Sequence, residues 1–246
     1  MSHNVVVAGA SRGIGLALVK YTLLQNDKSH VAAGVRTPSK ATELAELAKN
    51  YAGRLHIFTL DVDSDDSIKA FTASVTAAFP NGVDVLINNA GVLPAPTATL
   101  AEVTRKDFLD GFNTNALSSY YVTVAFLPLL SKSNNGKVVN VSSLLGSIGV
   151  AAETIAYGAT PAYRASKAAM NMLSAVLAAV NPDVTIVTSH PGVVLTDMAA
   201  SAGIKEGFPN SITTEVSATS LLKVIDGLTK ADSGKFVSYD GTTLPW

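Results

Sequence analysis

A tyrosine and a lysine stand four positions apart in the run Tyr163-Arg164-Ala165-Ser166-Lys167. On a helix, that spacing places both side chains on one face, one turn apart. A free phenol has a pKa near ~10 and exchanges protons poorly at neutral pH. A nearby ammonium lowers that pKa, so the phenol can act as a general acid toward a carbonyl oxygen, or as a base in the reverse direction. The pair therefore predicts proton transfer at Tyr163, although the same spacing also arises by chance on solvated helices.

A glycine-rich turn near the start of the chain has the pattern of a phosphate site. Gly9, Gly13 and Gly15 follow the apolar run 5–8 and open a helical pattern. Glycines permit a tight turn and a close approach of the backbone to a pyrophosphate, and the free N–H groups of the helix attract phosphate. The strand before the turn and the helix after it favour dinucleotide binding over a plain strand-to-helix turn.

An arginine takes the position that decides between the two nicotinamide cofactors. Arg36 ends the second predicted strand, 21 positions after Gly15. An acidic residue there would bond the adenosine 2′-hydroxyl of NAD, whereas an arginine pairs with the 2′-phosphate of NADP. Arg12, inside the glycine turn, supplies a second positive charge. We therefore expect NADPH rather than NADH, unless both arginines are simply solvated surface residues.

Short β-branched runs alternate with longer helical patterns and define the elements that must position these residues. Strands are expected at 5–8, 31–35, 55–60, 83–88, 137–142, 184–189 and 236–239, and helices at 14–24, 42–52, 67–79, 104–114, 115–131, 162–180 and 217–228. Several strands are apolar from end to end, as strands covered on both faces are. The alternation predicts an α/β fold, a single doubly wound Rossmann domain over residues 1–246 with a largely parallel sheet of about seven strands and helices on both faces. Ligands of such sheets bind beyond the carboxyl ends of the strands, where the motifs lie.

Composition argues against several other classes of protein. The 246 residues carry 18 Lys and Arg against 19 Asp and Glu, and this near-zero net charge of −1 argues against nucleic acid or an anionic membrane as a partner. No cysteine is present, which excludes disulfides, thiolate metal sites and a cysteine nucleophile. The histidines lack metal-ligand spacing, so no metal site is expected. With no secretory pattern and no apolar run of bilayer length, we expect a cytoplasmic protein.

Three further segments, taken with the two motifs above, resemble those of a known family. Asn-Asn-Ala-Gly at 88–91 ends the fourth strand, Val-Ser-Ser at 141–143 ends the fifth, and His-Pro-Gly-Val-Val-Leu-Thr at 190–196 follows the sixth. Together with the Gly-x-x-x-Gly-x-Gly turn and the Tyr-x-x-x-Lys pair, they resemble the short-chain dehydrogenase/reductase family over nearly the whole chain. Ala8 departs from the family, which usually has a threonine there to support the turn.

The resemblance implies a catalytic role for four residues: Asn115, Ser143, Tyr163 and Lys167. Ser143 would polarise the substrate carbonyl, with its neighbour Ser142 as the alternative. Asn115 would complete a proton relay to the lysine. Asn113 competes for that role, and a helix cap is the plain structural explanation of Asn115.

The resemblance also implies a set of cofactor-binding residues. Asp61 and Val62 would contact the adenine, unless Asp61 only caps a helix, and Lys167 would bond the nicotinamide ribose. The full set is Gly9, Ser11, Arg12, Gly13, Ile14, Gly15, Arg36, Asp61, Val62, Asn89, Ala90, Gly91, Tyr163, Lys167, Pro191, Gly192, Val194 and Thr196. We interpret His190 as a packing residue and not a general base, because Tyr163 already fills the acid/base role.

The length of chain between the catalytic residues bears on the substrate. Ser143 and Tyr163 lie 20 positions apart, more than in many members of the family. This spacing and the ending 239–246 resemble a subgroup that includes norsolorinic-acid-type ketoreductases, sniffer-like carbonyl reductases and C-factor-like proteins. A substrate lid is implied in the loop near 197–214. A hydrophobic pocket for a small apolar carbonyl substrate is expected from Leu93, Leu145, Ile148, Met198 and Phe208.

These features together predict an NADPH-dependent reductase of ketones or aldehydes with Tyr163 as the general acid. One alternative is an NADP(H)-binding sensor or signalling protein with little turnover. Another is the same site working as an alcohol dehydrogenase. Helices near 104–131 and 162–180 often form a four-helix interface in the family, so a homodimer, a homotetramer and a monomer all stay open.

Overall fold

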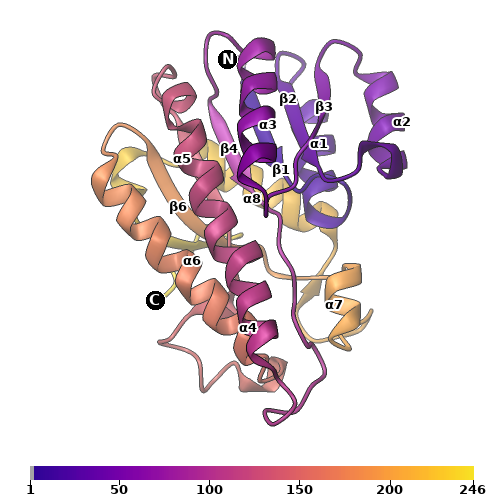
Figure 1. The fold of residues 1–246 in the computed structure, drawn as a ribbon, viewed down its shortest axis with the longest axis vertical. Coiled ribbons are helices and arrows are strands. Elements are labelled where there is room, and N and C mark those ends of the chain that lie inside the picture. Colours follow the sequence, from indigo (N-terminus) through magenta and orange to yellow (C-terminus); the bar gives the residue numbers. More distant parts are fainter. Residues whose placement is uncertain (1–2) are drawn as a thin grey trace.

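A seven-stranded parallel sheet forms the centre of residues 3–246, the part of the chain that the computed structural model describes (Figure 1). Its order is β3-β2-β1-β4-β5-β6-β9. The strands are β1 (Asn4–Ala8), β2 (His30–Val35), β3 (Leu55–Thr59), β4 (Val85–Asn88), β5 (Lys137–Val141), β6 (Thr185–His190) and β9 (Phe236–Ser238). The chain order reverses between β1 and β4, which is the point where ligands of doubly wound sheets bind. The predicted α/β fold with about seven parallel strands is confirmed.

Helices cover both faces of this sheet (Figure 1). One face carries α1 (Gly13–Gln25), α2 (Thr42–Asn50) and α8 (Thr214–Gly227); the other carries α3 (Asp65–Ala78), α5 (Ser118–Leu130) and α6 (Pro161–Val180). Along β1, Val5 and Val7 pack in the core beneath α1 and α8, whereas Val6 and Ala8 pack in the core beneath α3, α5 and α6. Because successive side chains of a strand point to opposite faces, a strand buried on both faces is apolar from end to end.

The two helices predicted at 104–114 and 115–131 form one continuous helical stretch. It consists of α4 (Arg105–Gly111), the π-helical turn η2 (Phe112–Leu117) and α5, without a break. A π turn inserts an extra residue into a helix and is frequent at functional sites. Here the turn contains Asn115, which is fully buried.

Beyond the carboxyl edge of the sheet, several short elements connect the strands. β7 (Val193–Val194) and β8 (Ser211–Ile212) pair in parallel, and α7 (Asp197–Ser201) lies between them in the chain. The expectation of a plain loop over 197–214 is therefore corrected. The side chain of Thr196 caps α7 by accepting a hydrogen bond from the Ala199 N–H at 3.2 Å. Single turns of 3-10 helix form η1 (Pro38–Lys40), η3 (Leu144–Gly146) and η4 (Ile155–Tyr157), whereas η5 (Lys230–Asp232) lies at the opposite, amino edge, before β9. Such short elements lack the repeated periodicity by which sequence predicts helices and strands.

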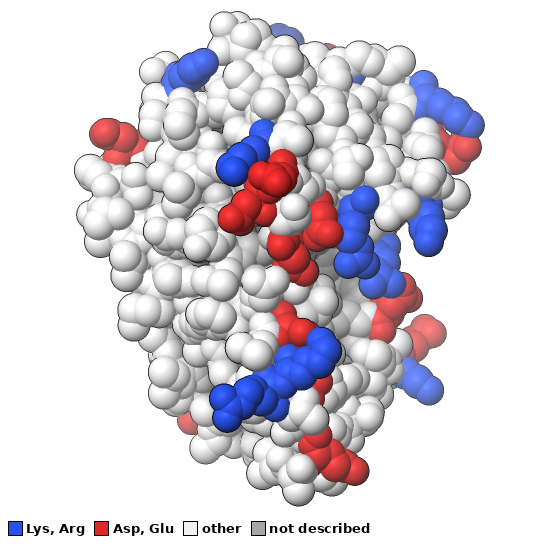
Figure 2. Space-filling model, in the orientation of Figure 1, with Lys and Arg blue, Asp and Glu red and all other residues white. Residues whose placement is uncertain are grey.

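Charged side chains of both signs run down the middle of the face seen in Figure 2, and they do not gather into one basic patch. Lys69 pairs with Asp66 on α3, and Lys106 pairs with Asp110 on α4. Within residues 3–246, no helix has both the length and the apolar character needed to cross a membrane. The same residues bring no group of three or more His, Asp or Glu side chains into the arrangement of a metal site.

Candidate active site

The glycine turn between β1 and α1 packs tightly against the segment after β4. Gly9 and Gly13 have φ angles of +86° and +57°, in the left-handed region that favours glycine. A Cβ at Gly9 would lie 2.6 Å from the Ala90 nitrogen, and one at Gly15 would lie 2.1 Å from the Gly9 oxygen. Asn89 holds the turn from the other side, because its Nδ2 donates to the Gly9 oxygen at 2.8 Å. No side chain caps the start of α1, so its first N–H groups are available to a phosphate.

The remaining residues of the turn include one of the two arginines expected at a 2′-phosphate. Ser11 and Arg12 are exposed, and Ile14 is partly buried. Arg12 Nη1 lies 3.2 Å from Asp197 Oδ2, with the two side chains 76% and 79% exposed. Arg36 follows β2 directly, is exposed, and makes no side-chain hydrogen bond or ion pair with the described residues. An exposed ion pair contributes little stability, so both guanidinium groups can turn toward an added anion.

Asp61 and Val62 lie directly after β3, at the same edge of the sheet, and both are partly buried. Asp61 Oδ1 accepts the Asp63 N–H at 3.2 Å. The cap of α3 is Ser64, whose side chain accepts the Ser67 N–H at 3.3 Å. Asp61 is therefore not the helix cap; its carboxylate instead stabilises the turn to Asp63.

The two serines at the end of β5 differ in their surroundings. Ser142 is buried, and its hydroxyl donates to Asn171 Oδ1 at 2.6 Å. Ser143 is partly buried, and its Oγ accepts the Leu145 N–H at 3.2 Å. The hydroxyl of Ser143 also lies near enough to the phenol of Tyr163 to lower the pKa of that phenol by hydrogen bonding. The structure thus brings Ser143, and not Ser142, to the phenol.

The pKa of the Tyr163 phenol is raised, whereas the sequence predicted that it would be lowered. Burial raises the pKa, and the hydrogen bond with Ser143 lowers it by a smaller amount. Lys167 Nζ lies over the phenol ring, 5.7 Å from the centroid, so the ammonium contacts the ring. The prediction that this ammonium makes the phenol acidic is wrong for the folded chain, because burial is the larger effect. Tyr163 is therefore protonated at neutral pH.

Lys167 is buried beneath the site, with 4% of its surface exposed. Its Nζ donates to the Val141 carbonyl at 2.7 Å, and burial lowers its pKa to about 7. An ammonium has three donors, so donors remain for a ligand hydroxyl. A Cβ at Gly91 would lie 3.7 Å from this Nζ, and the absence of that atom leaves space beside the ammonium. This geometry fits the ribose of a nicotinamide nucleotide.

Asn115 links the segment after β4 to α6. Its Oδ1 accepts the Val92 N–H at 2.8 Å, and its Nδ2 donates to the Val92 carbonyl at 3.0 Å and to Ser166 Oγ at 2.8 Å. These contacts make it a link within the site and not a helix cap. Asn113, the competing candidate, is exposed.

The segment 190–196 runs from the end of β6 past the glycine turn. Gly192 has a φ angle of +92°, and a Cβ there would lie 2.6 Å from Ile212 Cδ1. Ser217 Oγ donates to the Pro191 carbonyl at 2.7 Å and so ties this turn to α8. A Cβ at Gly13 would lie 3.4 Å from Thr196 Cγ2, which places Thr196 beside the phosphate turn. Val194 is buried in β7.

His190 holds the segment that follows Ser143. Its Nδ1 accepts the Leu144 N–H at 3.2 Å. Burial lowers its pKa to about 4, with Asp240 acting weakly in the opposite direction, so the ring is neutral at pH 7. Its ring meets that of Tyr239 edge-on, with centroids 6.5 Å apart. These contacts support the interpretation of His190 as a packing residue.

The five residues expected at the substrate differ widely in exposure. Ile148 is 78% exposed and Met198 is 37% exposed, whereas Leu93, Leu145 and Phe208 are partly buried. Exposure alone does not assign these residues to a substrate, so their role stays a prediction.

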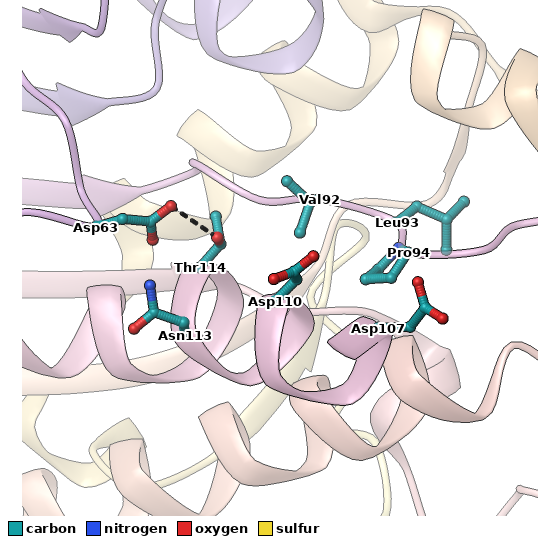
Figure 3. A pocket seen from close by; sticks show the side chains of 8 residues that line it. All are labelled: Asp63, Val92, Leu93, Pro94, Asp107, Asp110, Asn113 and Thr114. Carbon is teal, nitrogen blue, oxygen red and sulfur yellow. Dashed lines mark hydrogen bonds between the residues drawn. The ribbon is translucent and has the colours of Figure 1, made fainter. Parts of the chain in front are cut away.

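A cavity of about 310 Å³ lies between α4, η2 and the segment after β4 (Figure 3). Of the expected substrate residues, its lining contains Leu93. The lining residues are Asp63, Val92, Leu93, Pro94, Asp107, Asp110, Asn113 and Thr114, and Thr114 Oγ1 donates to Asp63 Oδ2 at 2.9 Å. Its three carboxylates make it acidic, and none of Ser143, Tyr163 and Lys167 lines it. This cavity is therefore distinct from the site formed by those three residues.

Sequence reasoning missed several residues that support the site. Asn171 bonds Ser142 through its Oδ1 and donates from Nδ2 to the Gly146 carbonyl at 3.3 Å. The signal was its position four residues after Lys167, which places it on the same face of α6. Tyr157 packs against Phe208, with ring centroids 6.0 Å apart, and no local sequence pattern predicts that contact.

Comparison with known proteins agrees with this geometry. Residues 3–207 match the family model described as short chain dehydrogenase. The chain belongs to the short chain dehydrogenase family, and the expectation of an oxidoreductase of this class is confirmed. It is 36% identical to the short chain dehydrogenase gsfK of Penicillium aethiopicum, with 100% of both chains covered.

Two solved structures are similar over the whole chain. The NADPH-bound carbonyl reductase from chicken fatty liver is 33% identical, with a TM-score of 0.92 and 100% of this chain and 94% of that chain covered. The carbonyl reductase Sniffer of D. melanogaster is 31% identical, with a TM-score of 0.89 and full coverage of both chains.

Proposed function

We propose that this chain is an NADPH-dependent carbonyl reductase that acts on ketones or aldehydes. The observation that carries the proposal is the convergence of the Ser143 hydroxyl and the Tyr163 phenol above the buried ammonium of Lys167. These groups lie at the carboxyl edge of the sheet, which also carries the glycine turn. The printed names of the two solved relatives, both carbonyl reductases and one of them bound to NADPH, support the same activity and cofactor.

The residues fit the cofactor part by part. The turn of Gly9, Gly13 and Gly15 would receive the pyrophosphate, because it leads into the start of α1, where no side chain caps the first N–H groups. Arg12 and Arg36 would pair with the 2′-phosphate. The spare donors of Lys167 would bind the ribose hydroxyls, and Asp61 and Val62 would meet the adenine. The backbone of Val194 and the hydroxyl of Thr196 would hold the carboxamide. When bound, NADPH supplies the hydride that reduces the carbonyl carbon.

The protein supplies the proton and stabilises the developing charge. Tyr163 donates its phenolic proton to the carbonyl oxygen, and Ser143 donates a hydrogen bond to the same oxygen. The raised pKa of Tyr163 keeps the phenol protonated at neutral pH, which is the form that reduction requires. In the reverse reaction, oxidation of an alcohol, the phenolate of Tyr163 would accept the proton. The partly buried apolar side chains of Leu93, Leu145 and Phe208 favour an uncharged substrate.

Replacement of Tyr163 by phenylalanine tests the proposal. Removing the proton donor should lower turnover of an aryl ketone by about 10²- to 10⁴-fold, while NADPH binding, measured by cofactor fluorescence, changes little. Tyr121→Phe is the matched control, because Tyr121 is exposed on α5 and lies outside the site. Near-normal turnover in Tyr163→Phe would overturn the mechanism. Wild-type protein that binds NADPH but oxidises it with no ketone or aldehyde would instead favour the sensor.

A further inference from the structure

The segment 147–160, here called the wall segment, connects η3 to α6 and lies between Ser143 and Tyr163 in the chain. Its apolar side chains are not buried; Ile148 and Ile155 are 78% and 58% exposed. The buried members of the wall segment are Ser147, Thr154 and Thr160, all with hydroxyl side chains. A surface segment without buried apolar side chains has little of its own to hold it in one conformation. Polar contacts with other elements must therefore fix it.

Arg164 holds one end of the wall segment. Its Nη1 donates to Thr154 Oγ1 at 2.9 Å, and its Nη2 donates to the Thr154 carbonyl at 2.7 Å and the Gly158 carbonyl at 2.9 Å. Its Nε lies 3.3 Å from the same Gly158 oxygen. The rigid, planar guanidinium suits such a set of acceptors better than an ammonium. Because Arg164 directly follows Tyr163 on α6, this contact ties the wall segment to the helix that carries the proton donor.

The last two residues of the sequence hold the other end. Ser147 Oγ donates to the Pro245 carbonyl at 2.8 Å, and the Gly149 N–H donates to the Trp246 carbonyl at 2.7 Å. The Trp246 ring stacks on Phe236, with centroids 5.7 Å apart and planes 20° apart. Phe236 is buried in β9. The stacked rings thus anchor the two carbonyls to the edge strand of the sheet.

Between these two anchors the wall segment reaches the region beyond α7. The ring of Tyr157, at the end of η4, meets the ring of Phe208, with centroids 6.0 Å apart. η3, which directly precedes the wall segment, packs on Lys167, since a Cβ at Gly146 would lie 2.7 Å from Lys167 Cβ. The wall segment therefore spans the distance from the catalytic residues to Phe208.

We propose that Arg164 and Trp246 are positioning residues that fix the wall segment as one side of the substrate site, with Tyr157 and Phe208 presented to the apolar part of a bulky aryl carbonyl substrate. The inference rests on the proposed reductase activity. If either anchor is lost, the wall segment must become ordered when substrate binds. That ordering weakens binding of a substrate long enough to touch it. A small carbonyl that contacts Ser143 and Tyr163 alone is unaffected.

Steady-state kinetics with two substrates of different size test the proposal. Arg164→Met and Trp246→Ala should each raise KM for a two-ring aryl ketone by about tenfold. In both variants, kcat for this ketone, KM for a small aliphatic aldehyde and the affinity for NADPH should change by less than about twofold. Trp246→Phe keeps an aromatic ring on Phe236 and should restore the wild-type KM. Arg105→Met is the matched control, because Arg105 is exposed on α4. Equal KM changes for both substrates, or none, would overturn the proposal.

Amide hydrogen exchange gives a readout that does not depend on activity. Both variants should lose protection in peptides covering 147–158, where the Gly149 N–H bonds the Trp246 carbonyl, while peptides of β1 and β4 stay protected. Unchanged exchange in both variants would contradict the anchoring even if the protein proves inactive as a reductase. Conversely, a reductase inactivated by Tyr163→Phe but indifferent to both anchor variants would keep the proposed function and remove this inference alone. If Arg164→Met fails to fold, Trp246→Ala decides, because Trp246 is 44% exposed and lies outside the two buried apolar clusters on the faces of the sheet.

Discussion

Tyr163 and Lys167 stand one helical turn apart, yet their side chains influence each other less than their burial does. Burial raises the pKa of the phenol and lowers the pKa of the ammonium to about 7, so each shift favours the neutral form. The cause is desolvation, which disfavours the charged form of both acids and bases. The ammonium bonds the Val141 carbonyl and faces the phenol ring, and this is weak compensation for the lost water. A buried pair of this kind is held at a cost in stability.

Replacing Lys167 by methionine should therefore stabilise the protein while abolishing its activity. The ammonium has a pKa of about 7 when folded against 10.5 when exposed, so the unfolded chain binds more protons between these values. The free-energy cost of burying the charged ammonium is complete below pH 7 and disappears as the pH rises toward 10.5. We expect Lys167→Met to raise the free energy of unfolding at pH 7 by about 1 kcal/mol, with a smaller gain at about pH 9. Thermal unfolding at both pH values measures this difference.

Lys137→Met provides the control for that experiment. Lys137 is equally buried, but its Nζ donates to the Ile225 carbonyl at 2.6 Å and the Asp226 carbonyl at 3.1 Å, at the end of α8. Its ammonium bonds carbonyl groups of the last turn of α8, where helix N–H partners run out, so its removal should lower stability and leave NADPH binding unchanged. A Lys167→Met variant that is less stable than the wild type at pH 7 would contradict the argument.

Arg36 is the residue at which cofactor choice can be reversed. Its guanidinium is exposed and unpaired within residues 3–246, so no internal contact is lost when it is replaced. Arg36→Asp should raise the Kd for NADPH by about 10- to 100-fold, because a charge-assisted contact with the 2′-phosphate becomes a repulsion. The affinity for NADH should rise. Fluorescence titration with both cofactors measures the change, and Arg105→Asp reports the effect of the charge alone. Undiminished NADPH affinity would remove Arg36 from the cofactor site.

At the scale of elements, the glycine turn shows how a short motif depends on its neighbour. Gly9 and Gly53 have similar φ angles, +86° and +79°. A Cβ at Gly53 would meet nothing within 4 Å, whereas one at Gly9 would lie 2.6 Å from the Ala90 nitrogen. The conformation is thus equally unfavourable for alanine at both positions, but the turn after β1 additionally presses against the segment after β4.

The two glycines make a matched pair of substitutions. Gly53→Ala should lower the free energy of unfolding by about 1 kcal/mol, through backbone strain alone, and leave NADPH binding intact. Gly9→Ala should cost about 2–4 kcal/mol, because the backbone at Ala90 must also move, and should weaken NADPH binding. Chemical denaturation and cofactor titration separate the two contributions. Equal losses for the two variants would show that the close approach to Ala90 has no energetic consequence.

At the scale of the whole molecule, a buried polar chain crosses from the sheet to a helix behind the site. Asn88 Nδ2 on β4 donates to Asn140 Oδ1 on β5 at 2.7 Å, and Asn140 Nδ2 donates to Ser174 Oγ on α6 at 2.7 Å. All three residues are buried. Because a buried polar group without a partner is costly, this chain specifies how α6, and with it Tyr163, sits on the sheet.

Asn140→Ala breaks the chain at its centre. The donors of Asn88 and the hydroxyl of Ser174 lose a partner, so we expect the free energy of unfolding to fall by about 2–4 kcal/mol. Turnover should fall more than NADPH binding at the glycine turn, since α6 carries Tyr163, the proposed proton donor. Asn134→Ala, at an exposed position, controls for loss of the amide. A denaturation midpoint equal to that of the wild type would show that the chain is not needed for the packing of α6.

Much of this arrangement could be predicted from the sequence, because the motifs are local. The glycine turn, the Tyr-x-x-x-Lys spacing and the end-to-end apolar strands each depend on a few neighbouring residues. They predicted the parallel sheet, its strands to within about two residues, and the edge at which the site lies. The same reasoning missed α7 and β8, and it divided the continuous helical stretch 105–130 in two, because single turns and π turns leave no periodic signal.

The tertiary structure alone decided questions that depend on packing between distant segments. It distinguished Ser143 from Ser142, because the Ser142 hydroxyl is bound to Asn171. It also distinguished Asn115 from Asn113, because Asn115 is buried and bonds Val92. It also reversed the expected shift of the phenol pKa, since desolvation depends on every residue around a group and not on its neighbour in the chain. Residue types and spacing determined which chemistry is available to this protein. Burial and long-range contacts determined which of the candidate side chains come together and in which protonation state, because those properties arise only when segments far apart in the sequence exclude water together.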